Sequence, residues 1–269
     1  MHIFDTATAL TELDQGHLTG QTSTDYGNLV GPFGGILAAN LMRAVLEDSR
    51  ATGDPISITV NFCAAVSDGA FDITTKLVRA GKYVQHWSLE LAQGEKICST
   101  ASIILAKRQV DFSHQTMDAP QITPPQDCPP LPEVASFSNW LNRYEFRFAE
   151  GPPPTGAQPA DALASPRSAL WIADKPDRPL DYLSLTALSD SFLLRLFHVR
   201  GTLVPMGTVS LTTHFIGTTA ELAEQGTEPL LGIADAIRFH GNFHDQSMQL
   251  WSTSGKLLAT GTQIVWFKE

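Results

Sequence analysis

The sequence is short of cysteine, of basic residues and of long apolar runs, and each shortage excludes a class of protein. Lysine and arginine number 18 against 28 aspartates and glutamates, which gives a formal net charge of −10. Proteins that follow nucleic-acid phosphates usually carry a concentrated basic stripe, so nucleic acid is not an expected partner. Cys63, Cys98 and Cys128 are too few and too widely spaced for a disulfide framework or a CxxC metal pair. A reducing, cytoplasmic location is therefore expected.

Membrane insertion is not expected either. The first residues, MHIFDTATALTELDQGH, lack the basic start and the continuous apolar run of a signal peptide, and no apolar run is long enough to span a bilayer. With 269 residues, 43% of them hydrophobic, the chain can form one large core or two ordinary cores. We expect a soluble globular protein.

Proline is concentrated in one part of the chain. Eleven of the 17 prolines fall between Pro120 and Pro166, in stretches such as PQITPPQDCPPLPE that can sustain neither a helix nor a central strand. This composition divides the chain into an N-terminal unit (1–115), a proline-rich linker (116–140) and a C-terminal unit (141–269).

The two units repeat one order of elements. Each has an apolar helix, at residues 34–49 and about 180–198, followed by four runs with strand-like alternation. The runs are approximately residues 57–66, 71–80, 83–92 and 96–107 in the first unit, and 208–216, 230–239, 245–252 and 256–268 in the second. Consecutive strands after a single apolar helix favour an antiparallel sheet curled around that helix over alternating βαβ units. The predicted fold class is α+β.

This module resembles the hotdog fold, and its duplication is similar to the acyl-CoA thioesterase II type of double hotdog. The stretches that carry the resemblance are GPFGGILAANLMRAV, SLTALSDSFLLRLF, TVSLTTHFI and GKLLATGTQIVWF. The resemblance implies a tandem hotdog that hydrolyses acyl-CoA thioesters to free acid and CoA without a cofactor. It makes acyl-CoA the expected partner, and it leaves homo-oligomers of double-hotdog chains open.

The resemblance also implies a catalytic set. In that family an Asp of the second helix, a Thr at the start of the next strand and a Gln of the last strand hold the water that attacks the thioester. The matching residues are Asp190, Thr208 and Gln263. The sequence departs from the family pattern at Ser210, where an acidic residue is usual, and at Phe215-Ile-Gly-Thr, which affects the expected substrate preference.

The residues themselves support these assignments unequally. In a helix, Asp190 would lie among apolar neighbours. Burial there would raise the pKa of its carboxyl group toward the range of a general base. The alternative is that Asp190 lies on a solvent-facing strip with Ser189 and Ser191. Gln263 shares its strand face with apolar residues, although a place at the sheet margin is the alternative. The alternating neighbours of Thr208 are polar, so solvent exposure is equally expected for it.

Backbone N–H groups at Gly34 and Gly35, which open the first helix, are candidate donors to the developing oxyanion; tight joining of helix and sheet is the alternative role. Asn40 stands where the repeat would match Asp190, and Ile103 where it would match Gln263. One catalytic site per chain is therefore expected, with Gly34, Gly35 and Asn40 as substrate-binding candidates.

Other constellations carry less weight. His240 and His244 straddle a Gly-Asn turn without a third ligand, so no metal is expected. A hydratase would need a His with a nearby acid, but Asp235 and His240 would point to opposite faces of a strand. GxSxG, GxGxxG and P-loop motifs are absent from the sequence.

The remaining alternative is a non-catalytic acyl-thioester or hydrophobic-ligand binding protein. It is kept because few cations lie near the sheet margins to hold CoA phosphates: Arg79, Lys82, Lys107, Arg108 and Arg238.

Overall fold

The computed structural model describes residues 1–109, 112–132, 136–154, 156–159 and 162–268. The α-helices are α1 (Ile3–Ala7), α2 (Gly34–Leu46), α3 (Tyr182–Leu188), α4 (Arg195–Arg200) and α5 (Thr219–Gln225). Three short 3₁₀ helices are η1 (Thr24–Tyr26), η2 (Pro125–Asp127) and η3 (Ser136–Arg143). The strands before residue 110 are β1 (Leu10–Asp14), β2 (His17–Gln21), β3 (Asp54–Phe62), β4 (Ala70–Ala80), β5 (Val84–Gln93) and β6 (Lys96–Ala106). The later strands are β7 (Tyr144–Glu150), β8 (Ser168–Asp174), β9 (Met206–Phe215), β10 (Leu230–Asp235), β11 (Phe239–His240), β12 (Phe243–Trp251) and β13 (Leu257–Phe267).

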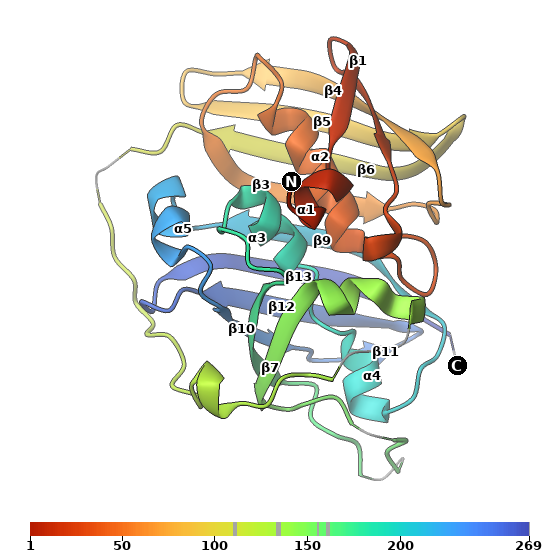
Figure 1. Ribbon diagram of the computed structural model, residues 1–269, viewed down its shortest axis with the longest axis vertical. Coiled ribbons are helices and arrows are strands. Elements are labelled where there is room, and N and C mark those ends of the chain that lie inside the picture. The colour runs from red at the N-terminus through yellow and green to blue at the C-terminus, as the bar shows by residue number, and fades with distance from the viewer. Residues whose placement is uncertain (110–111, 133–135, 155, 160–161, 269) are drawn as a thin grey trace.

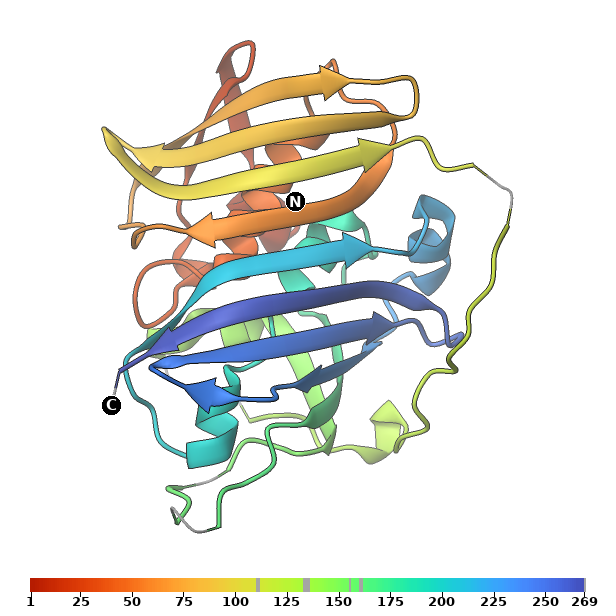
Figure 2. The same cartoon turned by 180° about the vertical axis from the view of Figure 1, so that it is seen from behind.

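Within the described residues, the strands form one antiparallel sheet in the order β1-β2-β4-β5-β6-β3-β9-β13-β12-β10-β8-β7, with β11 pairing with β12. The first half of the chain supplies β1 to β6 and the second half β7 to β13. The halves meet where β3 pairs with β9, and from behind they form one continuous layer (Figure 2). The predicted α+β class is confirmed.

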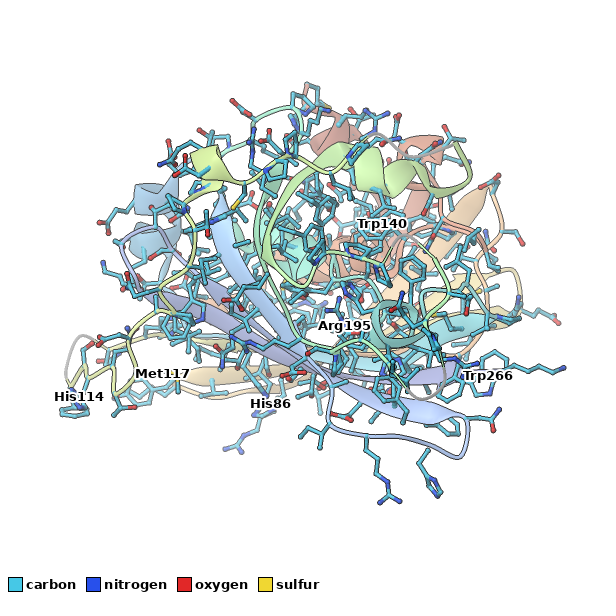
Figure 3. The ribbon with its side chains drawn as sticks, turned by 90° about the horizontal axis from the view of Figure 1, so that it is seen from below. His86, His114, Met117, Trp140, Arg195 and Trp266 are labelled. Carbon is cyan, nitrogen blue, oxygen red and sulfur yellow. The ribbon has the colours of Figure 1, made fainter. Side chains whose placement is uncertain are left out.

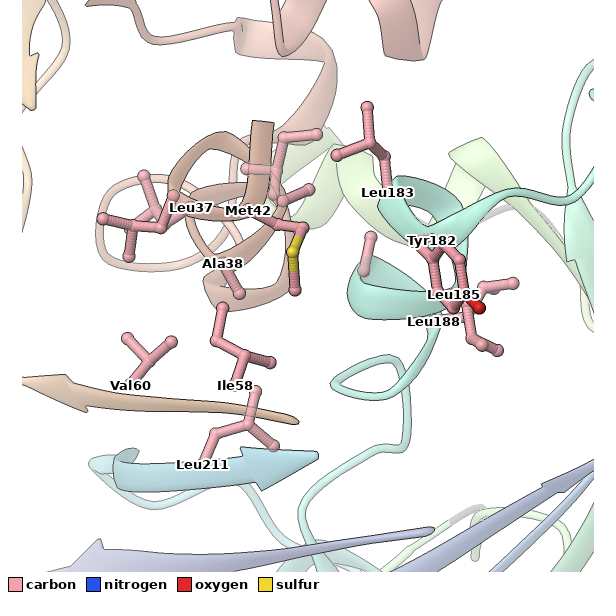
Figure 4. Packing of buried hydrophobic residues seen from close by; sticks show 14 of the residues in the cluster. Leu37, Ala38, Met42, Ile58, Val60, Tyr182, Leu183, Leu185, Leu188 and Leu211 are labelled. Atoms are coloured by element: carbon pink, nitrogen blue, oxygen red, sulfur yellow. The ribbon is translucent and has the colours of Figure 1, made fainter. Parts of the chain in front are cut away.

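The helices α2 and α3 lie together on the inner side of this sheet (Figure 1). Ten of the 13 residues of α2 are buried, which explains why its sequence is apolar on nearly every side. Figure 4 shows Leu37, Ala38 and Met42 of α2 above Ile58 of β3 and Leu211 of β9. The two halves therefore share one core, and the ends of α2 and α3 are held close to the central strands.

The predicted single helix over residues 180–198 is wrong. The structure has α3 and α4 instead, separated by a turn over residues 189–194. Ser189 donates its hydroxyl hydrogen to the carbonyl oxygen of Thr186 (2.7 Å), and Ser191 donates to that of Leu188 (2.6 Å). Serine side chains that bond nearby backbone groups in this way compete with helix continuation.

The strands β1, β2, β7 and β8 were not predicted from the sequence. β7 and β8 flank the proline-rich stretch of residues 151–166. The prolines of this stretch obscure the strand-like alternation on either side of it. The expected strand over residues 230–239 is also shorter in the structure, because β10 ends at Asp235. Residues 133–135 of the expected linker lie outside the described residues, and the linker boundaries stay a proposal. Among the described residues, no helix is long and apolar enough to span a membrane.

Candidate active site

Asp190 lies in the turn that ends α3, not in the helix where sequence reasoning placed it. Its backbone N–H donates to the carbonyl oxygen of Ala187 at 3.1 Å, which tightens the chain just past the last helical residue, Leu188. The carboxylate points inward, and the residue is only 9% exposed. The turn thus presents the acid at the end of α3 beside the sheet.

A chain of hydrogen bonds joins the three predicted residues. The Thr208 hydroxyl donates to Oε1 of Gln263 at 3.1 Å, and Nε2 of Gln263 donates to Oδ1 of Asp190 at 2.8 Å. Gln263 is 3% exposed, so its expected inward orientation is observed. Because Oε1 accepts from the hydroxyl, the amide nitrogen must face the carboxylate, which fixes the orientation of the glutamine.

A β-bulge brings Thr208 to this face. Along β9, Leu211 and Thr213 are buried, so strict alternation would turn Thr208 outward. The register with β13 shifts between Ile264 and Val265, which pairs Thr208 with the buried Val265 and leaves Val209 as the extra residue. The bulge therefore overturns the alternation that made exposure of Thr208 an equal expectation.

The start of α2 lies against the Asp190 carboxylate. The backbone N–H of Gly35 donates a hydrogen bond to it. A Cβ placed on Gly34 would lie 2.6 Å from Oδ2 of Asp190 and 3.1 Å from the ring of Phe62, so a side chain cannot be placed there without a shift. Glycine is therefore required at residue 34 for close approach, and the N–H of Gly35, expected as an oxyanion donor, binds the acid in the structure.

Burial raises the pKa of Asp190 from its ordinary value to about 7, against the hydrogen bonds from Gln263 and Gly35, which lower it. Both bonds favour the ionised form, while removal from water disfavours it. The balance leaves a carboxyl group that exchanges its proton near neutral pH, as general acid–base chemistry requires.

Asn40 is not brought to this cluster. It lies six residues into α2, about 9 Å along the helix axis from Gly34. Its side chain is buried, and its Oδ1 has no hydrogen-bond partner among the described residues. Its role in substrate binding stays a prediction.

The described residues hold no group of three His, Cys, Asp or Glu side chains suited to a metal ion. His240 pairs with Phe243 and His244 with Phe239 in the hairpin, so the two imidazoles lie on opposite faces. Among the cations considered for CoA phosphates, Arg108 donates to the carbonyl oxygens of Phe215 and Pro55 across the junction of the halves.

Sequence reasoning missed two groups near the site. Trp140 stacks on Phe33, the residue before Gly34, with ring centroids 4.2 Å apart; no pattern in the proline-rich stretch points to it. Gln246 lies directly opposite Gln263 in the register of β12 and β13 and is equally buried. Aligning that hairpin in the sequence would have revealed Gln246.

Comparisons with known proteins agree with this architecture. A family model described as the acyl-CoA thioesterase C-terminal domain matches residues 125–267, and the corresponding N-terminal domain model matches residues 23–106. A comparison with curated protein sequences found no match.

Similar folds occur among solved structures. A conserved protein of unknown function with a hot dog fold from Alicyclobacillus acidocaldarius is 35% identical over 100% of this chain and 99% of that chain, with a TM-score of 0.93. A putative thioesterase II from Thermobifida fusca YX is 18% identical over 100% and 98%, with a TM-score of 0.82. An acyl-CoA thioesterase II, TesB2, from Mycobacterium marinum is 16% identical over 98% of each chain, with a TM-score of 0.75. The predicted tandem hotdog fold is confirmed.

Proposed function

This chain belongs to the acyl-CoA thioesterase family of hydrolases, and from that premise we propose that Asp190, Thr208 and Gln263 catalyse hydrolysis of acyl-CoA to a free acid and CoA. The observation that carries the proposal is the hydrogen-bond chain from Thr208 through Gln263 to a buried carboxylate whose pKa is about 7. A group with this pKa can take a proton from water and return it at neutral pH.

Asp190 acts as the general base in this mechanism. Its carboxylate accepts a proton from a water molecule, whose oxygen attacks the thioester carbonyl carbon. A tetrahedral oxyanion forms, the C–S bond breaks, and the departing CoA sulfur takes the proton back from Asp190. Water addition and thiol departure thus balance without a cofactor.

Gln263 and Thr208 position the reacting groups. Gln263 holds the carboxylate through Nε2, and Thr208 holds Gln263 through Oε1, leaving the lone pairs of the Thr208 hydroxyl for the water. Gly34, half-buried at the positive end of α2, supplies its N–H to the oxyanion, because the N–H of Gly35 is bound to Asp190.

We further propose a cytoplasmic location and a role in acyl-group or lipid metabolism. The three cysteines are free thiols, one exposed and two buried, which fits a cytoplasmic enzyme of acyl-group or lipid metabolism.

The test is release of free CoA thiol from a panel of acyl-CoAs that differ in chain length and substitution, with Asp190→Asn as the matched control. We expect turnover by the natural protein and loss of turnover in the variant. Binding of acyl-CoA without release of thiol by the natural protein would favour the non-catalytic binding alternative.

A further inference from the structure

A second polar group lies next to the Asp190 site. Gln246 of β12 and Gln263 of β13 are direct partners in the sheet register, so their side chains share the inner face of neighbouring strands. Gln246 is 1% exposed, and its Oε1 accepts the backbone N–H of Arg195 at 3.3 Å. Arg195, the first residue of α4, is therefore held directly over the strand beside the catalytic glutamine.

The guanidinium of Arg195 is a buried cation that forms no ion pair with a carboxylate of the described residues. The residue has no exposed surface and lies in the interior of the molecule (Figure 3). Its nitrogens donate to neutral oxygens only: the carbonyls of Leu193 and Pro166 and the hydroxyl of Ser168. In the described part of the chain, no carboxylate lies within the 4.0 Å of an ion pair, and Asp235 acts on the guanidinium only from a longer distance. Burial lowers the pKa of Arg195 to about 9, which reflects an unfavourable charge.

The first half of the chain also has an arginine beyond its apolar helix, and its surroundings differ. Arg50 follows α2 and lies over the ring of Trp87, with its guanidinium carbon 5.3 Å from the ring centroid. Its Nη2 pairs with Oδ2 of Asp48 at 2.6 Å. Arg50 thus forms a direct ion pair, whereas Arg195 forms none with the described residues.

Three more buried nitrogen atoms of the second half have no hydrogen-bond partner among the residues that the structure describes. They are Nε2 of Gln246, Nε2 of His198 and Nε2 of His244. Burial, with a smaller contribution from the charge of Arg195, lowers the pKa of both histidines and favours their neutral forms. Nδ1 of His244 donates to the carbonyl oxygen of Asp245 at 2.8 Å, so Nε2 of this neutral ring is an acceptor and offers no hydrogen to an anion.

We propose that Arg195 and Gln246 bind a carboxylate on the acyl group, which makes short dicarboxylic acyl-CoAs the preferred substrate class. This inference rests on the proposed function, because that function places the thioester at Asp190. Neighbouring strands lie about 4.8 Å apart, so a carboxylate at Gln246 is only a few bonds from a thioester carbonyl at Gln263. A carboxylate would accept from the amide of Gln246 and neutralise the buried cation.

The position of the group favours the acyl end of the substrate over CoA. The phosphates of CoA are multiply charged and strongly hydrated, whereas Arg195 is buried beside the reacting centre. Further along the same face, Phe267 ends β13 at a hollow of about 410 Å³ that is also lined by Leu196 and Val199 of α4. The hollow and the buried guanidinium thus share the helix α4, which begins at Arg195.

The experiment compares substrates matched in carbon number. Glutaryl-CoA is compared with pentanoyl-CoA, and monomethyl glutaryl-CoA serves as the uncharged ester, each corrected for spontaneous hydrolysis. We expect the natural protein to show at least a tenfold higher kcat/KM for glutaryl-CoA than for either neutral substrate. Equal values, or a preference for pentanoyl-CoA, would overturn the inference and leave the proposed function standing.

Variants of Gln246 then test which residues cause the preference for glutaryl-CoA. Gln246→Leu removes the amide without changing side-chain size greatly, and we expect the glutaryl-to-pentanoyl ratio of kcat/KM to fall about tenfold. Gln246→Glu places an anion beside Arg195 and should reduce the ratio further through repulsion of the substrate carboxylate. The matched control is Gln85→Leu, which removes a buried glutamine from the corresponding strand β5 and should leave the ratio unchanged. An unchanged ratio in both Gln246 variants would show that Arg195 and Gln246 have a structural role and do not bind the substrate.

Equilibrium binding separates the two proposals. In the Asp190→Asn protein, glutaryl-CoA should bind more tightly than pentanoyl-CoA, and Gln246→Glu should abolish that difference. If the natural protein releases no thiol from any acyl-CoA, the proposed function fails while this binding measurement still decides the carboxylate site. Equal affinities for the two ligands would overturn the site.

Discussion

The two halves of the sheet share a backbone plan but differ in the polarity of a few inner side chains. Thr59 of β3 and Thr212 of β9 lie opposite each other at the junction, with their hydroxyl oxygens 3.0 Å apart. Counting outward from this pair through each register, Ile103 of the first half corresponds to Gln263 of the second. An amide that can bind an acid in one half is thus an aliphatic side chain in the other.

The correspondence extends to the neighbouring positions. Both central strands carry a register shift at the same place, and Pro55 corresponds there to Thr208. Trp87, which pairs with Ile103, corresponds to Gln246, which pairs with Gln263. The duplicated backbone, including the bulge, is therefore not sufficient to form a catalytic site. The difference lies in the side chains, because proline and tryptophan offer neither the hydroxyl nor the amide.

The ends of the two helices show the same contrast. Asp48 lies two residues beyond α2, as Asp190 lies two residues beyond α3, whereas Asn40, matched to Asp190 in the sequence, lies within α2. Hydrogen bonds from Arg50 hold the pKa of Asp48 below its usual range, while burial raises that of Asp190. An acid that stays ionised at neutral pH is a poor proton carrier, so only Asp190 suits general-base catalysis.

The largest expected effect comes from removing the general base. Asp190→Asn should lower kcat about 10²–10⁴-fold, because the amide keeps the size of the carboxylate but cannot accept the proton. Thiol release under substrate saturation measures this loss. Asp48→Asn is the matched control and should retain kcat, since Asp48 pairs with Arg50 away from the proposed chemistry. Equal losses in the two variants would contradict the asymmetry of the halves.

Stability should depend on pH through the same residue. The pKa of Asp190 is raised on folding, so the folded state holds its proton more tightly than the unfolded state does. The stabilisation is full below the unfolded pKa, near 3.8, and is lost as pH rises through about 7. The loss is on the order of 4 kcal/mol.

This dependence is measured as a difference between two proteins. The free energy of unfolding of the natural protein, relative to that of Asp190→Asn, should fall between pH 4 and pH 8. The buried Asp174, whose pKa is also raised, to about 6, contributes equally to both proteins and cancels. Parallel curves would mean that Asp190 ionises in the folded protein as it does in the unfolded chain.

Catalysis should show the opposite dependence on pH. Only the ionised carboxylate accepts a proton, so kcat/KM should rise about tenfold per pH unit up to about 7 and level off above it. Rates at pH 5 and pH 8 should then differ by about two orders of magnitude. A flat profile over this range, in enzyme shown to remain folded, would exclude Asp190 as the base.

Disturbing the close contact between α2 and the Asp190 carboxylate should have a smaller effect on kcat. Gly34→Ala should lower kcat about 10–100-fold, because the added Cβ would lie 2.6 Å from Oδ2 of Asp190 and displace the carboxylate. Gly156→Ala is the control, since a Cβ there meets nothing within 4 Å. Initial rates and circular dichroism of both variants separate displacement of the acid from loss of folding.

The sequence predicted more of the architecture than of the local geometry. Alternation and the repeat of elements were sufficient for the helix α2 and the eight central strands, because these depend on apolar periodicity. Identifying Asp190, Thr208 and Gln263 relied on the resemblance to a family. The helix break after Leu188 depends on serine side chains bonding the backbone, and the exposure of Thr208 depends on a bulge. Neither leaves a periodic signal.

The smallest expected effect comes from exchanging the residues that distinguish the two halves. Gln263→Ile places the first-half residue in the second half, so the carboxylate of Asp190 loses a donor and Thr208 loses its acceptor. We expect about a tenfold loss in kcat and a further rise in the pKa of Asp190, seen as a pH profile displaced to higher pH. The reciprocal Ile103→Gln buries an amide where the first half has no bound acid, so it should lower stability without altering the rate or the pH profile. A change of the pH profile in Ile103→Gln, or an unchanged pH profile in Gln263→Ile, would contradict this comparison. The polarity of the residue at this position would then not explain the functional difference between the two halves.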